Sequence, residues 1–178
     1  VRWRAVSASG SSCKGAHGMT EPYFPEQEVS TLLREKGLTL AAAESCTGGL
    51  IAKRMTDLSG ASQIFMGGVV SYTNQVKARV LGVPQALLDE YGAVSEPVAR
   101  AMAEGVRRIT GADVGVSVTG VAGPDRDDRG NEVGTVYIAL TCADGTHSRL
   151  CRFGTLSRAE IRTKAADAVF ALVQSKLD

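Results

Sequence analysis

The 178-residue chain has a formal net charge of +1 at pH 7, because 20 Lys and Arg residues balance 19 Asp and Glu residues, and 44% of its residues are hydrophobic. A chain of this length forms one domain with a sizeable core, and the near-neutral charge argues against direct nucleic-acid binding, which normally requires a strongly basic face. No apolar run approaches the roughly 20 residues that span a bilayer, so no membrane association is expected.

The first residues differ in composition from the rest of the chain. Residues 1–22 are rich in Ser, Gly and Ala and show no periodicity, which predicts a disordered tail before a single domain at residues 23–178. Met19 is a candidate start of the folded protein. The stretch after Arg2 and Arg4 is too short and too polar for a signal peptide.

The four cysteines are spaced neither as metal ligands nor as a disulfide scaffold. Cys13, Cys46, Cys142 and Cys151 are therefore expected to be free thiols in a reducing compartment, which predicts a cytoplasmic location. No ligand cluster in the sequence predicts a metal site, and no motif predicts a cofactor.

Periodicity in the first half of the domain predicts an alternation of helices and strands. A helix begins after Pro25 and ends at Gly37, because glycine readily adopts the left-handed conformation that closes a helix. The remaining segments of this half are a strand at residues 38–43, a helix at about 46–58, a strand at 65–72, a helix capped by Thr73, and a short helix between Gly82 and Gly92.

The second half predicts another interior strand, a hairpin and two longer helices. The interior strand is the apolar run at residues 114–118, which is typical of a strand buried on both faces. The other elements are a helix starting at Ser95, a hairpin of residues 133–141 and 147–153 around Asp144-Gly145, and a last helix that opens with the capping box of Ser157 and Glu160.

This element order predicts an α/β fold, a three-layer α/β/α sandwich on a mixed, mostly parallel sheet with a late β-hairpin. In such sheets ligands bind beyond the carboxyl ends of the strands. Three polar loops follow strands and are expected to meet there: residues 44–49, 72–77 and 119–125.

Ser45 is the candidate nucleophile. A strand, a tight glycine turn and a helix aim a hydroxyl and several backbone N–H groups at one point, where an anion or a developing oxyanion would be stabilised. Cys46 and Thr47 share this turn with Gly48 and Gly49. The alternative is structural, since Ser or Thr before a helix commonly caps it and Gly-Gly commonly makes a turn.

A serine nucleophile needs a base, and histidine is nearly absent from the predicted site. His17 falls in the tail and His147 beside a hairpin turn. A lysine with a lowered pKa is the remaining choice, and of the six lysines Lys77 follows a strand at the predicted site. We therefore predict a Ser45–Lys77 dyad with Tyr72 as proton relay or orienting group. The alternatives are a solvated helix lysine and a half-buried packing tyrosine.

Other residues near these loops have weaker assignments. Cys46 could compete as nucleophile, although a buried small side chain is its commoner role. Glu44 could orient Lys77 or a substrate amide, or be a solvated carboxylate. The turn at residues 119–124 suits close approach of a ligand to the backbone. Arg158 and Arg162, one helical turn apart, could clamp a phosphate or simply face solvent.

Taken together, the motifs are more specific than any one of them. They are AESCTGG at residues 43–49, SYTNQVK at 71–77, GAVSEPVA at 92–99, SVTGVAGP at 117–124, GTVYIA at 134–139, and SRAEIR, which holds Arg158 and Arg162. Over residues 26–176 the chain closely resembles the CinA C-terminal-domain family, which includes the nicotinamide-nucleotide amidases also called PncC.

The resemblance implies hydrolysis of the carboxamide of nicotinamide mononucleotide to nicotinic acid mononucleotide and ammonia, in pyridine-nucleotide recycling, without a cofactor. Matched to the family motif, the catalytic residues are Ser45, Lys77 and Tyr72. The substrate-binding residues that we predict are Glu44, Cys46, Thr47, Gly48, Gly49, Thr119, Gly120, Gly123 and Arg158.

Two other functions stay open: a nucleotide-binding regulatory module linked to competence or DNA damage, and an amidase for another small amide. The family often carries a larger N-terminal domain, so this chain is expected to be the stand-alone form. The charged segment 125–132 is expected to alter the loop over the substrate. Exposed helix faces at residues 84–110 leave room for a homodimer.

Overall fold

The computed structural model describes residues 24–178, and the tail predicted at residues 1–22 lies outside them, with Met19, Cys13 and His17. Helices and strands alternate along the described chain. The elements are α1 (Pro25–Lys36), β1 (Leu40–Glu44), α2 (Leu50–Thr56), the 3₁₀ helix η1 (Ala61–Gln63), β2 (Phe65–Val70), α3 (Asn74–Leu81), α4 (Gln85–Tyr91), α5 (Glu96–Thr110), β3 (Val114–Gly120), β4 (Thr135–Cys142), β5 (Gly145–Arg152) and α6 (Arg158–Leu177).

Within residues 24–178 the strands form one five-stranded sheet in the order β2-β1-β3-β4-β5. β1 pairs in parallel with β2 and β3, whereas β4 is antiparallel to both β3 and β5. Of the described strands, all but β4 therefore run in the same direction. This confirms the predicted mixed sheet with a late hairpin, whose strands extend closer to the turn than predicted.

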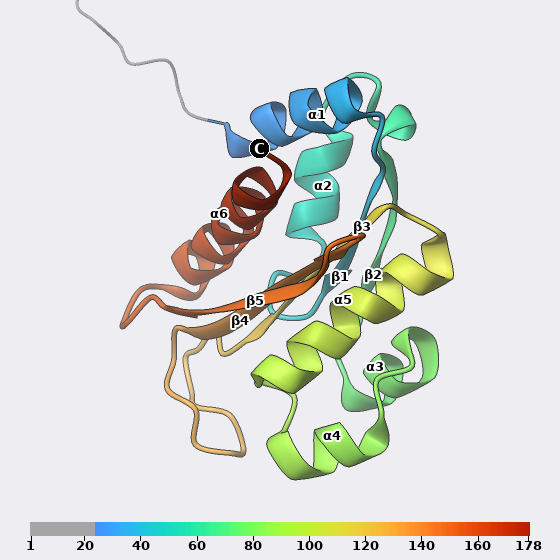
Figure 1. Cartoon of the computed structure of the whole chain (residues 1–178). Coiled ribbons are helices and arrows are strands. Elements are labelled where there is room, and N and C mark those ends of the chain that lie inside the picture. Colours follow the sequence, from blue (N-terminus) through green and yellow to red (C-terminus); the bar gives the residue numbers. More distant parts are fainter. Residues whose placement is uncertain (1–23) are drawn as a thin grey trace, which may run out of the picture.

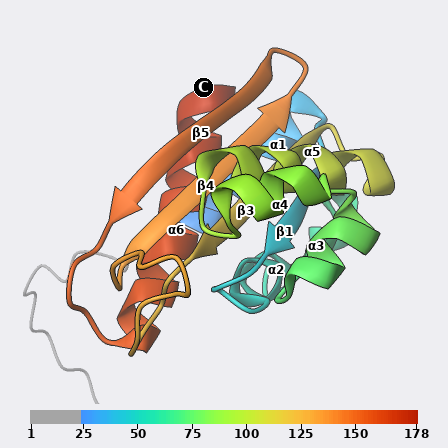
Figure 2. The same ribbon diagram turned by 90° about the horizontal axis from the view of Figure 1, so that it is seen from below.

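Helices cover both faces of the sheet. α1, α2 and α6 lie on one face and α3, α4 and α5 on the other (Figure 1), and Figure 2 shows α4 and α5 opposite α6 from below. The side chains of β1 alternate accordingly: Leu40 and Ala42 pack into the core under α6, while Ala41 and Ala43 pack into the core under α5. The predicted three-layer sandwich is confirmed.

Local capping chemistry sets several helix ends where the sequence predicts them. Gly37 ends α1 in the left-handed conformation, with φ of 64°. The Thr73 hydroxyl accepts the N–H of Val76 at the start of α3. Ser157 and Glu160 form the reciprocal capping box of α6. Each contact satisfies a backbone group that the helix itself leaves unpaired.

The helix predicted at residues 46–58 is shorter in the structure. α2 begins only at Leu50, because Gly48 and Gly49 have φ of 61° and 96°, outside the range of a right-handed helix. The preceding residues therefore form a turn, and β1 extends through Glu44, one residue beyond the predicted strand.

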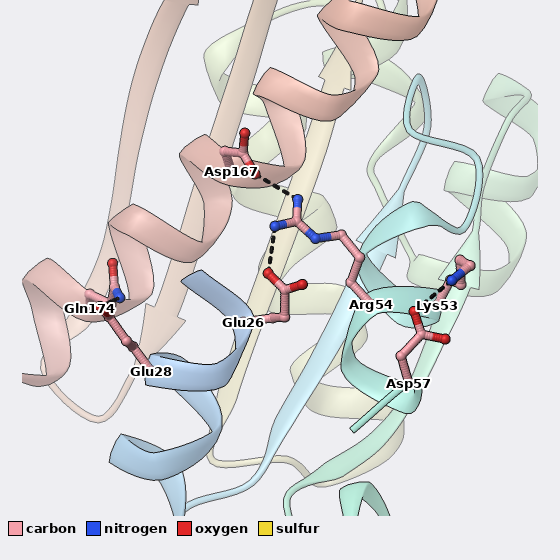
Figure 3. Close-up of polar contacts among 7 residues, drawn as sticks. All are labelled: Glu26, Glu28, Lys53, Arg54, Asp57, Asp167 and Gln174. Carbon is pink, nitrogen blue, oxygen red and sulfur yellow. Dashed lines mark hydrogen bonds and ion pairs between the residues drawn. The ribbon is translucent and has the colours of Figure 1, made fainter. Parts of the chain in front are cut away.

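An arginine on α2 fastens that short helix to its layer (Figure 3). Arg54 donates to Asp167 on α6 at 2.7 Å and to Glu26 on α1 at 2.5 Å. Its guanidinium also lies 4.8 Å from the centroid of the Phe170 ring. These contacts hold α2 against α1 and α6.

Two observations bear on the predictions from composition. Cys46, Cys142 and Cys151 are free thiols, as predicted. Among the helices of residues 24–178, none is both long and apolar enough to cross a bilayer.

Candidate active site

The carboxyl ends of β1, β2 and β3 bring the three predicted loops together. Glu44, the last residue of β1, pairs with Val70 of β2 and Val118 of β3. Beyond it the Ser45 N–H donates to the Val118 carbonyl at 3.0 Å, and the Ser71 N–H donates to the Glu44 carbonyl at 2.7 Å. A cavity of about 220 Å³ lies between the loops. Its lining comprises Ser45, Cys46, Tyr72, Lys77, Ala93, Val94, Thr119, Gly120, Ala122 and Arg158.

The side chains of Ser45 and Lys77 meet in this cavity. Lys77 Nζ lies 3.1 Å from Ser45 Oγ and donates to the Ser71 carbonyl at 2.7 Å. Lys77 lies on the buried side of α3 together with Leu81, one turn further along, so its side chain points inward. With 1% of its surface exposed, Lys77 is not the solvated helix lysine of the alternative interpretation.

Burial changes the protonation of this lysine. Loss of hydration lowers the pKa of Lys77 from 10.5 to about 8, because the charged ammonium is disfavoured away from water. Burial also raises the pKa of the neighbouring Cys46 thiol to about 12, so it is neutral at physiological pH. Because the Cys46 thiol is uncharged, it does not stabilise the Lys77 ammonium, and part of the Lys77 amine is unprotonated near neutral pH.

The Glu44 side chain binds the turn after Ser45 through hydrogen bonds. Its side chain is 1% exposed, and its carboxylate accepts four hydrogen bonds, which satisfies its charge without solvent. The donors are the Thr47 hydroxyl at 2.7 Å and the backbone N–H groups of Gly49, Ile51 and Ala52 at 3.0, 3.1 and 2.8 Å. The positive end of α2 is thus occupied by a carboxylate of the protein.

Two backbone N–H groups of the turn stay available. The Gly48 N–H donates to the Ser45 carbonyl at 3.1 Å, and the Gly49 N–H is bound by Glu44. Within the described residues, no oxygen of the protein accepts the N–H groups of Cys46 and Thr47, both of which are buried residues. The Cys46 N–H also interacts with its own sulfur, which is a weak acceptor, and Cys46 lines the cavity, so this N–H is the candidate to bind a ligand oxygen, with that of Thr47 behind it.

Arg158 is an exposed residue of the cavity lining. It donates to the Gly123 carbonyl at 2.7 Å and to the Tyr72 hydroxyl at 2.9 Å. Tyr72 is 58% exposed, and among the described contacts its hydroxyl makes no hydrogen bond to Ser45 or Lys77. The Thr119 hydroxyl, also in the lining, donates to the Ala93 carbonyl at 2.8 Å.

The structure brings most of the predicted site residues together but not all of them. Seven line the cavity: Ser45, Cys46, Tyr72, Lys77, Thr119, Gly120 and Arg158. Glu44, Thr47, Gly48 and Gly49 lie behind this lining, in the supporting turn, and Gly123 lines a neighbouring cavity of about 320 Å³ that shares Ala122 and Arg158 with the first. A side chain at Gly120 would collide with the Thr135 carbonyl, so this glycine is required for packing against β4.

Some contributors were missed by the sequence reasoning. Ala93, Val94 and Ala122 line the cavity without having been named as site residues. The available signals were the GAVSEPVA motif for the first two and the turn at residues 119–124 for Ala122. The Ser71 carbonyl that binds Lys77 has no sequence signal, because every residue carries that group. Arg162, interpreted either as part of a phosphate clamp or as a solvent-facing residue, instead donates to the Thr47 carbonyl at 2.7 Å.

The competing bases lie elsewhere. Lys53 is exposed on α2 and pairs with Asp57 at 2.5 Å. His147 lies on β5, at the opposite edge of the sheet from β2. Lys77 is therefore the amine that lies beside Ser45.

Comparison with known proteins assigns the chain to a family. The model of the CinA C-terminal domain matches residues 23–177. The chain belongs to the CinA family. CinA-like proteins of Geobacter sulfurreducens and Geotalea uraniireducens are 56% and 52% identical to it over 138 and 134 residues, covering 78% and 75% of this chain. The chain spans about a third of these relatives, 33% and 32% of their length.

Solved structures of CinA proteins share the fold. The competence-damaged protein (CinA) superfamily protein of Enterobacter cloacae matches with a TM-score of 0.85 at 29% identity, over 95% of this chain and all of that one. The competence/damage inducible protein of Agrobacterium tumefaciens gives a TM-score of 0.81 at 34% identity, over 86% of this chain and 96% of that one.

Proposed function

We propose that this CinA domain is an amidohydrolase that converts nicotinamide mononucleotide to nicotinic acid mononucleotide and ammonia. The observation that carries the proposal is the 3.1 Å separation of Lys77 Nζ and Ser45 Oγ, with the amine buried and its pKa lowered to about 8. A buried amine beside a serine hydroxyl, with the Cys46 N–H at the lining of the same cavity, suits acyl transfer from an amide. The CinA family is also known to include amidohydrolases.

The first step is attack by the serine. One N–H of neutral Lys77 binds the Ser71 carbonyl, which orients the nitrogen lone pair toward Ser45. Lys77 accepts the hydroxyl proton as Ser45 Oγ attacks the amide carbon. The developing oxyanion is stabilised by the N–H group of Cys46 at the cavity lining, and one such donor contributes about 3 kcal/mol in comparable sites.

The second step releases ammonia and regenerates the enzyme. The Lys77 ammonium gives its proton to the departing nitrogen, which leaves an acyl ester on Ser45. Lys77, neutral again, then activates water to hydrolyse that ester. The proposed relay through Tyr72 requires its hydroxyl to exchange Arg158 for a group of the substrate or the dyad.

Substrate recognition follows from the two adjoining cavities. The cavity at the dyad, about 220 Å³, suits a carboxamide-bearing ring, and Arg158 lies between it and the cavity of about 320 Å³. Arg158 is well placed to bind an anionic group of the substrate, because a guanidinium binds phosphate through two parallel N–H groups. A nucleotide bearing a small amide therefore fits the site better than a simple amide.

The test is ammonia release from nicotinamide mononucleotide, with the nucleotide product identified by chromatography. Ser45→Ala and Lys77→Ala are each expected to lose at least about 10³-fold in kcat/KM. Lys53→Ala, which removes an exposed lysine, is the matched control and is expected to retain full activity. Saturable nucleotide binding by an inactive parent protein would favour the regulatory alternative, and turnover of another small amide alone would change the substrate.

A further inference from the structure

Arg162 contacts the nucleophile turn from outside the cavity. It lies one helical turn after Arg158 on α6, and its Nη2 donates to the Thr47 carbonyl at 2.7 Å. Gly48 allows this approach, since a Cβ at that position would lie 3.3 Å from Nη2. The described residues that line the two cavities include Arg158 but not Arg162, so the two arginines face different targets.

This contact fixes one peptide group from both sides. The peptide between Thr47 and Gly48 donates its N–H to the Ser45 carbonyl at 3.1 Å, and its carbonyl accepts from Arg162. A peptide unit is planar, so holding its N–H and its carbonyl sets the orientation of the whole unit. The N–H of Thr47 belongs to the peptide immediately before it, and its direction is constrained in turn.

We infer that Arg162 is a positioning residue that orients the Ser45–Gly49 turn so that the Cys46 N–H at the cavity lining faces the oxyanion. The inference rests on the proposed amidase function. Arg162 acts on the transition state through the turn, whereas Arg158 acts on the bound substrate at the cavity. Loss of Arg162 therefore lowers kcat, and loss of Arg158 mainly raises KM.

The first experiment measures kcat and KM for Arg162→Met, Arg162→Lys and Arg158→Met. Arg162→Met is expected to lower kcat about 10²-fold, the effect of a displacement of about 1 Å in a reacting geometry, while KM stays within about threefold. Arg162→Lys keeps one donor and is expected to fall between parent and Arg162→Met. Arg54→Met, which removes a different arginine tie to α6, is the matched control and is expected to keep the parental kcat.

Chemical rescue separates positioning from a general loss of structure. Guanidinium ion at non-denaturing concentration is expected to raise kcat of Arg162→Ala several-fold and saturably, and to leave the parent and Arg54→Ala unchanged. The inference is overturned if kcat of Arg162→Met stays within about twofold of the parent, if KM alone changes, or if guanidinium has no effect on Arg162→Ala.

A substrate-independent readout keeps this inference separate from the proposed function. In reaction with a small sulfonyl fluoride, Ser45 Oγ attacks sulfur, the S–F bond breaks, fluoride leaves and the hydroxyl proton passes to Lys77. If the parent does not turn over nicotinamide mononucleotide, the proposed substrate fails, and the labelling rate then decides the role of Arg162. Slower labelling of Ser45 in Arg162→Met than in Arg54→Met supports positioning, and equal rates contradict it.

Discussion

The proposed mechanism predicts that the activity depends on pH through the protonation of Lys77. The fall of its pKa from 10.5 to about 8 corresponds to about 3 kcal/mol of destabilisation of the buried ammonium. In the proposed mechanism the neutral amine is the reactive form, so activity is expected to rise with pH. At pH 6 about 1% of a group with this pKa is neutral, and above pH 9 nearly all of it is, so kcat/KM is expected to rise about 100-fold over this range.

The assay is ammonia release at limiting nicotinamide mononucleotide, from about pH 6 to about pH 10, with far-ultraviolet circular dichroism as a check on folding. The Cys46 thiol, with its pKa raised by burial to about 12, contributes no inflection in this range. Lys77→Ala is expected to show only a small residual rate without the rise near pH 8. A parental profile that is flat through pH 8, or that rises with a midpoint near 6.5, would refute Lys77 as the base.

Three further predictions concern stability. Lys77→Met is expected to raise the free energy of unfolding at pH 7 by about 1–3 kcal/mol in urea titrations, because the variant buries no ammonium. This gain is expected to shrink as pH rises from 8 toward 10.5, because the parent's own Lys77 becomes neutral in the folded state over this range. Glu44→Gln replaces the carboxylate with an amide that cannot accept all four hydrogen bonds. The variant is expected to lower the free energy of unfolding by about 1–3 kcal/mol in the same titration and to lower kcat. An unchanged free energy of unfolding would contradict the supporting role of Glu44. Gly105→Ala places a Cβ against the Leu81 carbonyl where α5 meets α3. The variant is expected to be less stable by about 1–3 kcal/mol in thermal unfolding, while the folded fraction keeps its activity. An unchanged melting temperature would refute the close approach of these two helices.

The elements that the sequence predicts best are those whose ends depend on local chemistry. The capping box of Ser157 and Glu160 and the Thr73 cap each involve residues within one helical turn, so their spacing in the chain is sufficient to find them. The start of α2 was placed too early because Gly48 and Gly49, predicted to form a turn, both have positive φ, which a right-handed helix cannot include. Glu44 then binds amides in the first turn of α2, a contact that periodicity does not show.

The candidate site was predicted in outline because histidine is scarce. Excluding imidazole left a lysine beside the predicted edge of the sheet, and the structure places Lys77 within 3.1 Å of Ser45. The burial that lowers its pKa could not be predicted from a helix with this many polar residues. The relay by Tyr72, the homodimer and the cytoplasmic location stay predictions.

The identity of the nucleophile is tested most directly by mapping a covalent adduct. The protein is treated with a small sulfonyl fluoride, digested and sequenced by tandem mass spectrometry, which separates Ser45 from Cys46 within one peptide. The adduct is expected on Ser45 in the parent and to be nearly absent in Lys77→Ala. An adduct on Cys46, or labelling of Ser45 that is as fast without Lys77 as with it, would contradict the Ser45–Lys77 dyad.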